Sequence, residues 1–282
     1  MALMTEGRRK THVGDGVLIV KKEIGWTSHD VVAKVRGLLG GAKVGHAGTL
    51  DPAATGVLPL LIGKATRVAE YLVGWDKEYR AVLRLGETTD TQDATGTVLQ
   101  RVETTGVSLE ILDGVVARFR GPQKQVPPMY SAVKVAGRPL YKSARAGETV
   151  DRAERDIVIH ELEVTAIDGR DIGLRVVCSK GTYIRTLCAD MGQALGVGGH
   201  LLSLERTRVG SLAVEQGLTV KQLAAHVTVG SLGSVLLTLD QVLAELPLVT
   251  VTAEQAMRVL HGAPIGVPHN LPSTSAPIRV KD

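Results

Sequence analysis

Cysteine is scarce in this sequence, with only Cys178 and Cys188 among 282 residues and nine residues between them. A disulfide-stabilised fold would need more cysteines, and a structural zinc site would need closely spaced pairs, so the sequence argues against both. Two isolated cysteines are typical of proteins that work in a reducing compartment. We therefore expect a cytoplasmic protein.

Long apolar runs are also missing. No stretch approaches the roughly 20 apolar residues that a membrane-spanning helix needs. Residues 1–15 lack the apolar core of a signal peptide. We expect a soluble protein that is not exported and has no membrane partner.

Motifs of nucleotide-dependent enzymes and of common hydrolases are absent as well. Gly56 and the Gly63-Lys64 pair are separated by six residues, which is not the spacing of a phosphate-binding P-loop. No GxGxxG motif follows a predicted strand, and no GxSxG nucleophile elbow occurs. The sequence thus argues against a nucleotide cofactor and against this class of hydrolase.

The length of 282 residues predicts two domains, or one large domain with an appendage.

The charge of the chain is unevenly distributed. Net charge is only +4, but residues 1–50 hold eight Lys/Arg against four Asp/Glu, and residues 118–155 hold nine against three. Clustered cations suit a surface that binds phosphates, although two solvated faces with a chance excess of Lys and Arg would look the same.

The segment 44–58, VGHAGTLDPAATGVL, contains three glycines, one histidine and a single acidic residue, Asp51. Glycine permits positive φ angles and close approach of another chain, so the pattern predicts a tight loop of the kind that often carries a functional site. Pro52 disfavours a helical conformation for Asp51. An ordinary helix start, with Asp51 as N-cap and Pro52 as first helical residue, fits the same residues.

Hydrophobic patterns predict the elements around this loop. Residues 16–22 form a short apolar run typical of a buried strand, and Thr27-Ser28-His29-Asp30 has the capping-box form of a helix start. Residues 77–86 alternate, with Tyr79 and every second residue after it on one face of a half-exposed antiparallel strand. Further strands are expected at 57–62, 157–167, 172–178 and 202–210, and helices at 64–73 and after Ser108.

Four blocks spread over roughly residues 16–245 carry a family resemblance: the strand that ends at Lys22, the loop 44–58, the string SKGTYIR at 179–185 and the strand LSLERTRVG at 202–210. Together they resemble the pseudouridine synthases, in particular the TruB-type tRNA pseudouridine-55 synthases. One departure is local, because relatives carry Lys-Pro after the first strand and this chain has Lys22-Glu23. The change affects the expected loop geometry more than the chemistry.

The resemblance implies an α+β pseudouridine synthase fold, with a large mixed, mainly antiparallel sheet and flanking helices. Residues 1–245 would form the catalytic domain, and its basic segment at about 121–156 would be an insertion that closes over an RNA stem-loop. Residues 246–282 resemble the start of the small β domain (PUA type) that many relatives carry. They are short for that fold, so we expect a truncated or diverged PUA-like module.

The implied reaction, uridine to pseudouridine, breaks an N-glycosidic bond and joins C5 to the ribose without net redox change. We therefore expect no metal and no cofactor. A carboxylate nucleophile suffices, and it can attack either the base or the ribose. By resemblance, Asp51 is this nucleophile, Arg185 its permanently charged partner, and Tyr79 the ring that stacks on the target base. From spacing alone, Arg185 would be a helix-surface residue and Tyr79 a core residue.

The target uridine must leave its stack to reach such a site, at a cost of roughly a few kcal/mol. By resemblance, His46 fills the gap, Tyr183 and Leu204 form apolar walls of the uracil pocket, and Lys22 contacts RNA or supports structure near the site. Other interpretations stay open. His46 would also fit a backbone-bonded loop histidine or a neutral general base, and Tyr183 and Leu204 would also fit plain core positions.

These observations indicate an isomerase that converts uridine 55 in the TΨC loop of tRNA to pseudouridine. Its partner would be the T-arm stem-loop, and we expect a monomer. The alternative is a non-catalytic RNA-binding protein or tRNA-folding chaperone on the same scaffold. The joint presence of Asp51, Tyr79 and Arg185 speaks against that alternative.

Overall fold

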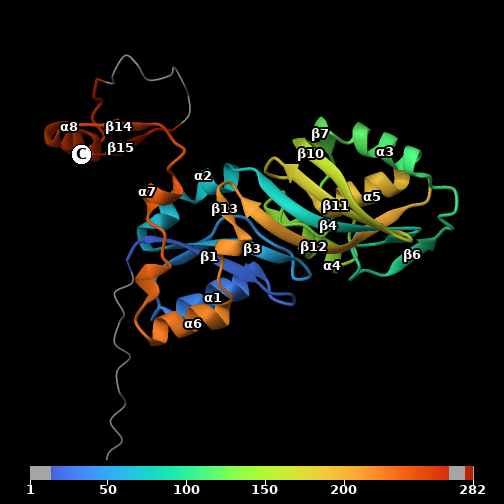
Figure 1. Cartoon of the computed structure of the whole chain (residues 1–282), viewed down its shortest axis with the longest axis horizontal. Coiled ribbons are helices and arrows are strands. Elements are labelled where there is room, and N and C mark those ends of the chain that lie inside the picture. The colour runs from blue at the N-terminus through green and yellow to red at the C-terminus, as the bar shows by residue number, and fades with distance from the viewer. Residues whose placement is uncertain (1–13, 267–276, 282) are drawn as a thin grey trace, which may run out of the picture. The chain divides into compact units, whose positions relative to one another are not determined.

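The computed structural model describes residues 14–266 and 277–281 (Figure 1). The chain divides into two compact units, Met1–Leu236 and Leu237–Asp282. The first unit contains a large sheet covered by helices, and the described part of the second contains two short helices and a pair of short strands besides irregular chain. No helix in the described part of the chain is both long and apolar enough to cross a membrane.

Nine strands form the main sheet. They are β1 (Gly16–Lys22), β2 (Val44–His46), β3 (Thr55–Ile62), β4 (Lys77–Leu85), β7 (Gly121–Gln125), β10 (Arg155–Asp168), β11 (Asp171–Cys178), β12 (Gly199–Val209) and β13 (Leu212–Ala213). Their order is β1-β3-β12-β4-β11-β10-β7, with β2 paired to β3 and β13 paired to β12. Every pairing is antiparallel except a short parallel contact between β3 and β12. The predicted α+β class and mainly antiparallel mixed sheet are confirmed.

Helices and short strands complete the first unit. The helices are α1 (Ser28–Leu38), α2 (Ala69–Gly74), α3 (Leu109–Arg118), α4 (Leu140–Arg145), α5 (Ile184–Ala194) and α6 (Val220–Thr228), with 3₁₀ turns η1 (Gly63–Val68), η2 (Val214–Gln216) and η3 (Leu232–Ser234). Two small hairpins pair β5 (Glu87–Thr89) with β6 (Val98–Arg101), and β8 (Lys134–Val135) with β9 (Arg138–Pro139). The single helix predicted at 64–73 is divided between η1 and α2.

Helix α1 begins as the sequence predicts. The Thr27 hydroxyl accepts from the Asp30 backbone N–H (3.0 Å), and the Asp30 carboxylate accepts from the Thr27 N–H (2.9 Å), which completes the capping box. Its buried face packs with α6 against β1 and β3, and a second apolar cluster lies between α3, α5 and strands β4, β10 and β11. These two clusters fix the helices on the sheet.

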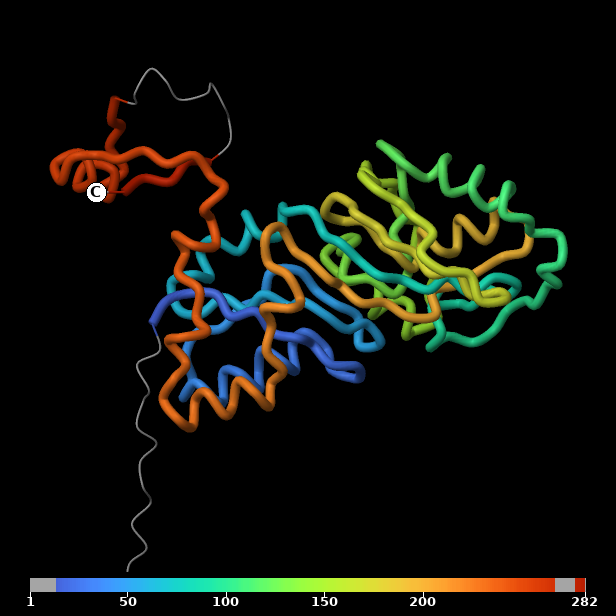
Figure 2. The backbone as a smooth tube through the Cα atoms, viewed as in Figure 1, coloured from blue at the N-terminus to red at the C-terminus, as the bar shows by residue number. Residues whose placement is uncertain are grey.

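Strand β4 lies in the middle of the sheet, between β12 and β11. Its residues alternate between buried and more exposed positions, as predicted, with Tyr79 on the buried face. Strand β12 comes from far along the sequence and runs between β3 and β4 (Figure 2). The loop that precedes β3, Tyr79 on β4 and the side chains of β12 are therefore neighbours.

The basic segment joins the main sheet at both ends. Residues 121–125 form β7, which pairs with Arg155–Ile159 at the start of β10. The part outside the main sheet is therefore 126–154, which contains the β8/β9 hairpin and α4. The sequence missed β7 because Gly121 and Pro122 resemble a loop.

The second unit contains α7 (Leu239–Val242), β14 (Leu248–Thr250), α8 (Ala253–Leu260) and β15 (Arg279–Lys281). Strands β14 and β15 pair in parallel. Residues 267–276 and 282 of the expected PUA-like segment lie outside the described residues. Cys178 and Cys188 belong to the first unit, where both are buried free thiols.

Gly56 allows β3 and β12 to meet, and its replacement tests this crossing. It has φ of +102°, and a Cβ atom there would overlap with the carbonyl oxygen of Arg206. A positive φ alone costs a residue with a side chain about 1–3 kcal/mol. We expect Gly56→Ala to lower the free energy of unfolding, measured by denaturant titration, by at least this amount.

The matched control is Gly37→Ala, because Gly37 lies in α1 with open space at the Cβ position. This variant should be unchanged or more stable by up to about 1 kcal/mol. Similar stability of the two variants would contradict the role given to Gly56.

Candidate active site

Asp51 lies in the loop between β2 and β3, and the N-terminal part of the chain holds this loop. The hydroxyl of Ser28 accepts from the Leu50 N–H (2.8 Å) and donates to the Leu50 carbonyl (3.2 Å). The Gly25 N–H donates to the carbonyl of Pro52 (2.9 Å). Because a turn and then strand β3 follow Asp51, the alternative of an ordinary helix start is wrong.

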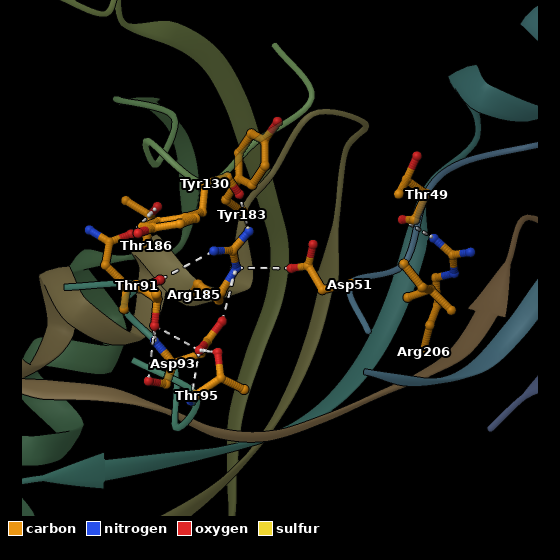
Figure 3. A network of polar contacts seen from close by, with 12 residues as sticks. Thr49, Asp51, Thr91, Asp93, Thr95, Tyr130, Tyr183, Arg185, Thr186 and Arg206 are labelled. Atoms are coloured by element: carbon orange, nitrogen blue, oxygen red, sulfur yellow. Dashed lines mark hydrogen bonds and ion pairs between the residues drawn. The ribbon is translucent and has the colours of Figure 1, made fainter. Parts of the chain in front are cut away.

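Arg185 lies in the first turn of α5 and is 5% exposed. Its Nε lies 2.9 Å from Oδ2 of Asp51 (Figure 3). Nη1 donates to the carbonyl of Thr91 (3.2 Å), and Nη2 donates to the carbonyl of Tyr130 (2.7 Å). Since arginine stays protonated at every accessible pH, Asp51 faces a permanent cation that is fixed from three sides.

A second carboxylate, Asp93, also faces Arg185, and the sequence analysis missed it. Its Oδ2 lies 3.7 Å from the arginine Nε. Its Oδ1 accepts hydrogen bonds from the Thr91 hydroxyl (2.8 Å), the Thr95 hydroxyl (2.6 Å) and the Thr95 N–H (2.9 Å). The Thr-x-Asp-x-Thr spacing at 91–95 is a signal for such a turn, but it does not indicate contact with Arg185.

The environment of Asp51 disfavours its charged form. Burial raises the pKa of this carboxyl above its ordinary value, Arg185 opposes the shift, and Asp93 adds to it. The side chain nevertheless stays 42% exposed and lines a cavity. An accessible carboxylate with a perturbed pKa beside a fixed cation is a candidate nucleophile.

Tyr79 lines the same cavity from β4 and is 8% exposed. Burial raises the pKa of its phenol to about 12, and the charge of nearby Arg206 opposes the shift. The phenol therefore keeps its proton at neutral pH and can act as a hydrogen-bond donor. Tyr79 is therefore both a buried core residue and part of the cavity lining, the two positions that the sequence left open.

Tyr183 and Leu204 also line the cavity, whose volume is about 260 Å³. The backbone of Tyr183 is fixed by Gln125, whose side chain accepts from its N–H (2.8 Å) and donates to its carbonyl (3.1 Å). Burial raises the pKa of Tyr183. The structure thus brings five of the seven predicted site residues to one cavity.

The other two predicted residues lie outside the cavity lining. His46 ends β2, and its pKa is lowered by burial and then by the charge of Arg206, so the imidazole is neutral at pH 7. Lys22 is 1% exposed, and its Nζ donates to the carbonyls of Trp26 (2.7 Å), Glu23 (3.1 Å) and Pro52 (3.3 Å). This burial favours the supporting role for Lys22 and leaves it no surface for RNA.

The cavity offers one carboxylate, several cations and two phenols to a ligand. These groups suit a ligand made of a flat, polar ring attached to a sugar. The carboxylate lies where it can attack such a ligand as a nucleophile. Within residues 14–266 and 277–281, no three His, Cys, Asp or Glu side chains are grouped as a metal site requires.

Comparison with known proteins gives a consistent match along the chain. Residues 36–184 match the model of the TruB family pseudouridylate synthase N-terminal domain, and residues 185–245 match the tRNA pseudouridylate synthase B C-terminal domain. The tRNA pseudouridine synthase B of Thermobifida fusca (strain YX) is 48% identical over 258 residues, which cover 89% of this chain and 86% of that protein. The protein of the same name from Ralstonia pickettii (strain 12J) is 46% identical over 270 residues, 94% of this chain and 83% of that protein.

Solved structures with the same fold include a chain of a Cbf5-Nop10-Gar1 complex, with a TM-score of 0.70 and 32% identity over 88% of this chain and 67% of that chain. A chain of an H/ACA RNP bound to a substrate RNA containing 2'-deoxyuridine has a TM-score of 0.68 and 29% identity, over 89% of this chain and 67% of that chain.

The raised pKa of Asp51 predicts that its charge destabilises the fold. The carboxyl is neutral in both the folded and unfolded states below the ordinary Asp pKa of about 3.9, and as the pH rises past this value the unfolded state loses its proton first. Stability is therefore lost as the pH rises toward the folded pKa. We expect Asp51→Asn to have a higher thermal midpoint than the unmodified protein at pH 7, and the difference should shrink at pH 3.5.

The matched control is Asp156→Asn, because Asp156 is exposed and, among the described residues, forms an ion pair only with the exposed Lys124. Its midpoint should change little at either pH. A lower midpoint of Asp51→Asn at pH 7 would contradict the raised pKa.

Proposed function

The chain belongs to the TruB family of pseudouridylate synthases, and we propose that it converts uridine 55 of tRNA to pseudouridine. It is an isomerase, since product and substrate have the same atoms. The observation that carries the assignment of the site is the 2.9 Å contact between Asp51 and Arg185 in an open cavity.

The proposed reaction needs a nucleophile and a site that holds a detached base. The bond between ribose C1′ and N1 of the base breaks, the base turns, and C1′ joins C5. The hydrogen on C5 leaves as a proton, N1 gains a proton, and no electrons are exchanged with another molecule. The Asp51 carboxylate adds either to C1′ or to the base, and both routes end with its release.

The neighbouring residues support each part of this reaction. Arg185 balances the charge of Asp51 and keeps the carboxylate oriented toward the cavity. Tyr79, Tyr183 and Leu204 supply flat and apolar walls for an extruded uracil. A neutral His46, at the end of β2 directly before the loop of Asp51, has the character required to occupy the space that the base leaves.

Exposed cations supply the proposed RNA surface. Lys134, Lys142 and Arg145 are exposed, lie on the part of the basic segment outside the main sheet, and form no ion pair with any described residue. Arg138 of the same segment forms an ion pair with Glu148 (2.8 Å), which partly neutralises its charge. We propose that this segment binds the phosphates of the tRNA T-arm stem-loop, and that one copy of the chain acts as a monomer in the cytoplasm.

Replacing the proposed nucleophile tests the reaction. Asp51→Ala should lower the rate of pseudouridine formation by roughly 10⁴-fold or more, because the carboxylate is the group that attacks. Affinity for tRNA should stay within about twofold, because the cations of the basic segment remain. The rate is measured by chromatography of nucleosides from digested tRNA, and the affinity by filter binding.

Asp113→Ala is the control, because Asp113 lies on α3 with an exposed side chain. It should keep full activity. An Asp51→Ala protein that still forms pseudouridine would exclude the nucleophile, and unmodified protein that binds tRNA without turnover would favour the RNA-chaperone alternative.

The basic segment predicts steep salt dependence of tRNA binding. Removing three phosphate contacts by Lys134→Ala, Lys142→Ala and Arg145→Ala together should weaken binding at low salt and reduce the slope of log K against log salt by about two to three. The rate on saturating tRNA should change little, since none of the three lines the cavity.

The control variant removes three exposed cations from α1 and α6: Lys34, Arg36 and Lys221. It has the same change in net charge and should retain most of the slope. Equal loss in the two variants would contradict the special role of the segment, because binding would then depend on net charge or equally on the basic stretch 1–50.

A further inference from the structure

Arg206 on β12 is a buried cation that the sequence analysis passed over. It is 1% exposed, and it is the direct cross-strand neighbour of Tyr79 on β4. No carboxylate of the described residues lies within ion-pair distance of its guanidinium, whereas Arg185 has two. A buried charge without an acidic partner is costly, so its position calls for a function.

The guanidinium of Arg206 binds the loop that carries Asp51. Its Nη2 donates to the carbonyl of Gly48 (3.1 Å) and its Nη1 to that of Thr49 (3.3 Å). Its Nε donates to the carbonyl of Val57 (2.8 Å), on the other side of Asp51 in the sequence. One side chain thus joins both arms of the loop, and in the view of Figure 3 Asp51 is drawn between Arg185 and Arg206.

The sequence leaves room for this contact. A Cβ atom on Gly48 would lie 3.5 Å from Nη1 of Arg206, and Gly48 has φ of +96°. At Gly48 the positive φ is what favours glycine, since the 3.5 Å distance is an ordinary contact, whereas at Gly56 in β3 a Cβ atom would also overlap with the backbone of Arg206. The backbone conformation thus accounts for Gly48, and the close approach of Arg206 accounts in addition for Gly56.

The charge of Arg206 reaches several groups around the cavity. It opposes the burial that raises the pKa of Tyr79, and it adds to the burial that lowers the pKa values of Lys22, His46 and Lys77. A guanidinium has five N–H groups. The backbone carbonyls of Gly48, Thr49 and Val57 accept from three of them. The guanidinium also lines the cavity and lies within hydrogen-bonding reach of the Tyr79 phenol.

We propose that Arg206 is a positioning residue for the isomerisation, which fixes the loop of Asp51 by its fork of hydrogen bonds and holds a permanent positive charge beside Tyr79. The inference rests on the proposed function, because the two groups it positions are those assigned to the reaction. Arg206 acts through Asp51 and Tyr79, so its removal should affect the rate and not the affinity for tRNA.

The test separates charge from shape. Arg206→Ala should lower the rate on saturating tRNA by about 100-fold, as expected when a reacting group is misplaced by about 1 Å, with tRNA affinity within twofold of the unmodified protein. Guanidinium ion at millimolar concentration should restore the rate at least tenfold by entering the vacated space. Urea, which has a similar shape and N–H donors but no charge, should restore little.

Two further variants keep the test decisive. Arg206→Lys retains the charge without the fork, so its rate should lie between those of Arg206→Ala and the unmodified protein. Thr207→Val is the matched control: Thr207 is the next residue of β12, is buried, and bonds Glu78 (2.9 Å) instead of the loop. Its rate should stay within threefold of that of the unmodified protein. This variant measures how much the loss of one buried hydrogen bond in β12 lowers the rate.

Several outcomes would overturn the proposal. They are an unchanged rate in Arg206→Ala, a loss shared equally by Thr207→Val, equal restoration by urea and guanidinium, or a rate that neither guanidinium nor Arg206→Lys improves. Failure of the proposed function is distinct from all of these, because the unmodified protein would then form no pseudouridine.

Discussion

The contact between Asp51 and Arg185 is the constraint on which the site depends. A carboxyl surrounded by protein favours its neutral form, and only a fixed cation counteracts this effect without closing the cavity. Arg185 cannot turn away, because the carbonyls of Thr91 and Tyr130 hold its other two nitrogens. Asp93 shares the cation, so the site balances two acids against one arginine and leaves one of the acids open to a ligand.

Besides the Ser28 hydroxyl and the Gly25 N–H, cations bonded to backbone carbonyls support the loop of Asp51. Lys22 binds the carbonyl of Pro52, and Arg206 binds those of Gly48 and Thr49. Carbonyl dipoles satisfy these N–H groups but do not cancel their charge, unlike carboxylates. The region around the single exposed acid therefore stays positive, which suits a site that receives a polyanionic substrate.

The basic segment and the chemical site share structural contacts. The carbonyl of Tyr130, at the start of the segment outside the sheet, accepts from Arg185, and Gln125 at the end of β7 fixes the backbone of Tyr183. Ser131, the residue after Tyr130, lines the cavity. The segment that carries the exposed cations therefore also orients the residues at the reacting centre. A shift of this segment would move the Tyr130 carbonyl to which Arg185 donates.

The sequence by itself determined the capped start of α1 and the alternation of β4, because these depend on near neighbours in the chain, and through the resemblance of four blocks it indicated the family and the sheet class. It also indicated Asp51, Arg185 and Tyr79, through strings long enough to carry a resemblance. Only the tertiary structure decided that Asp93 faces Arg185, that Lys22 is buried beneath the loop, and that Arg206 joins its two arms. These contacts join groups far apart in sequence, so they exist only once the chain has folded. Those of Arg206, for example, require the strand order that places β12 between β3 and β4.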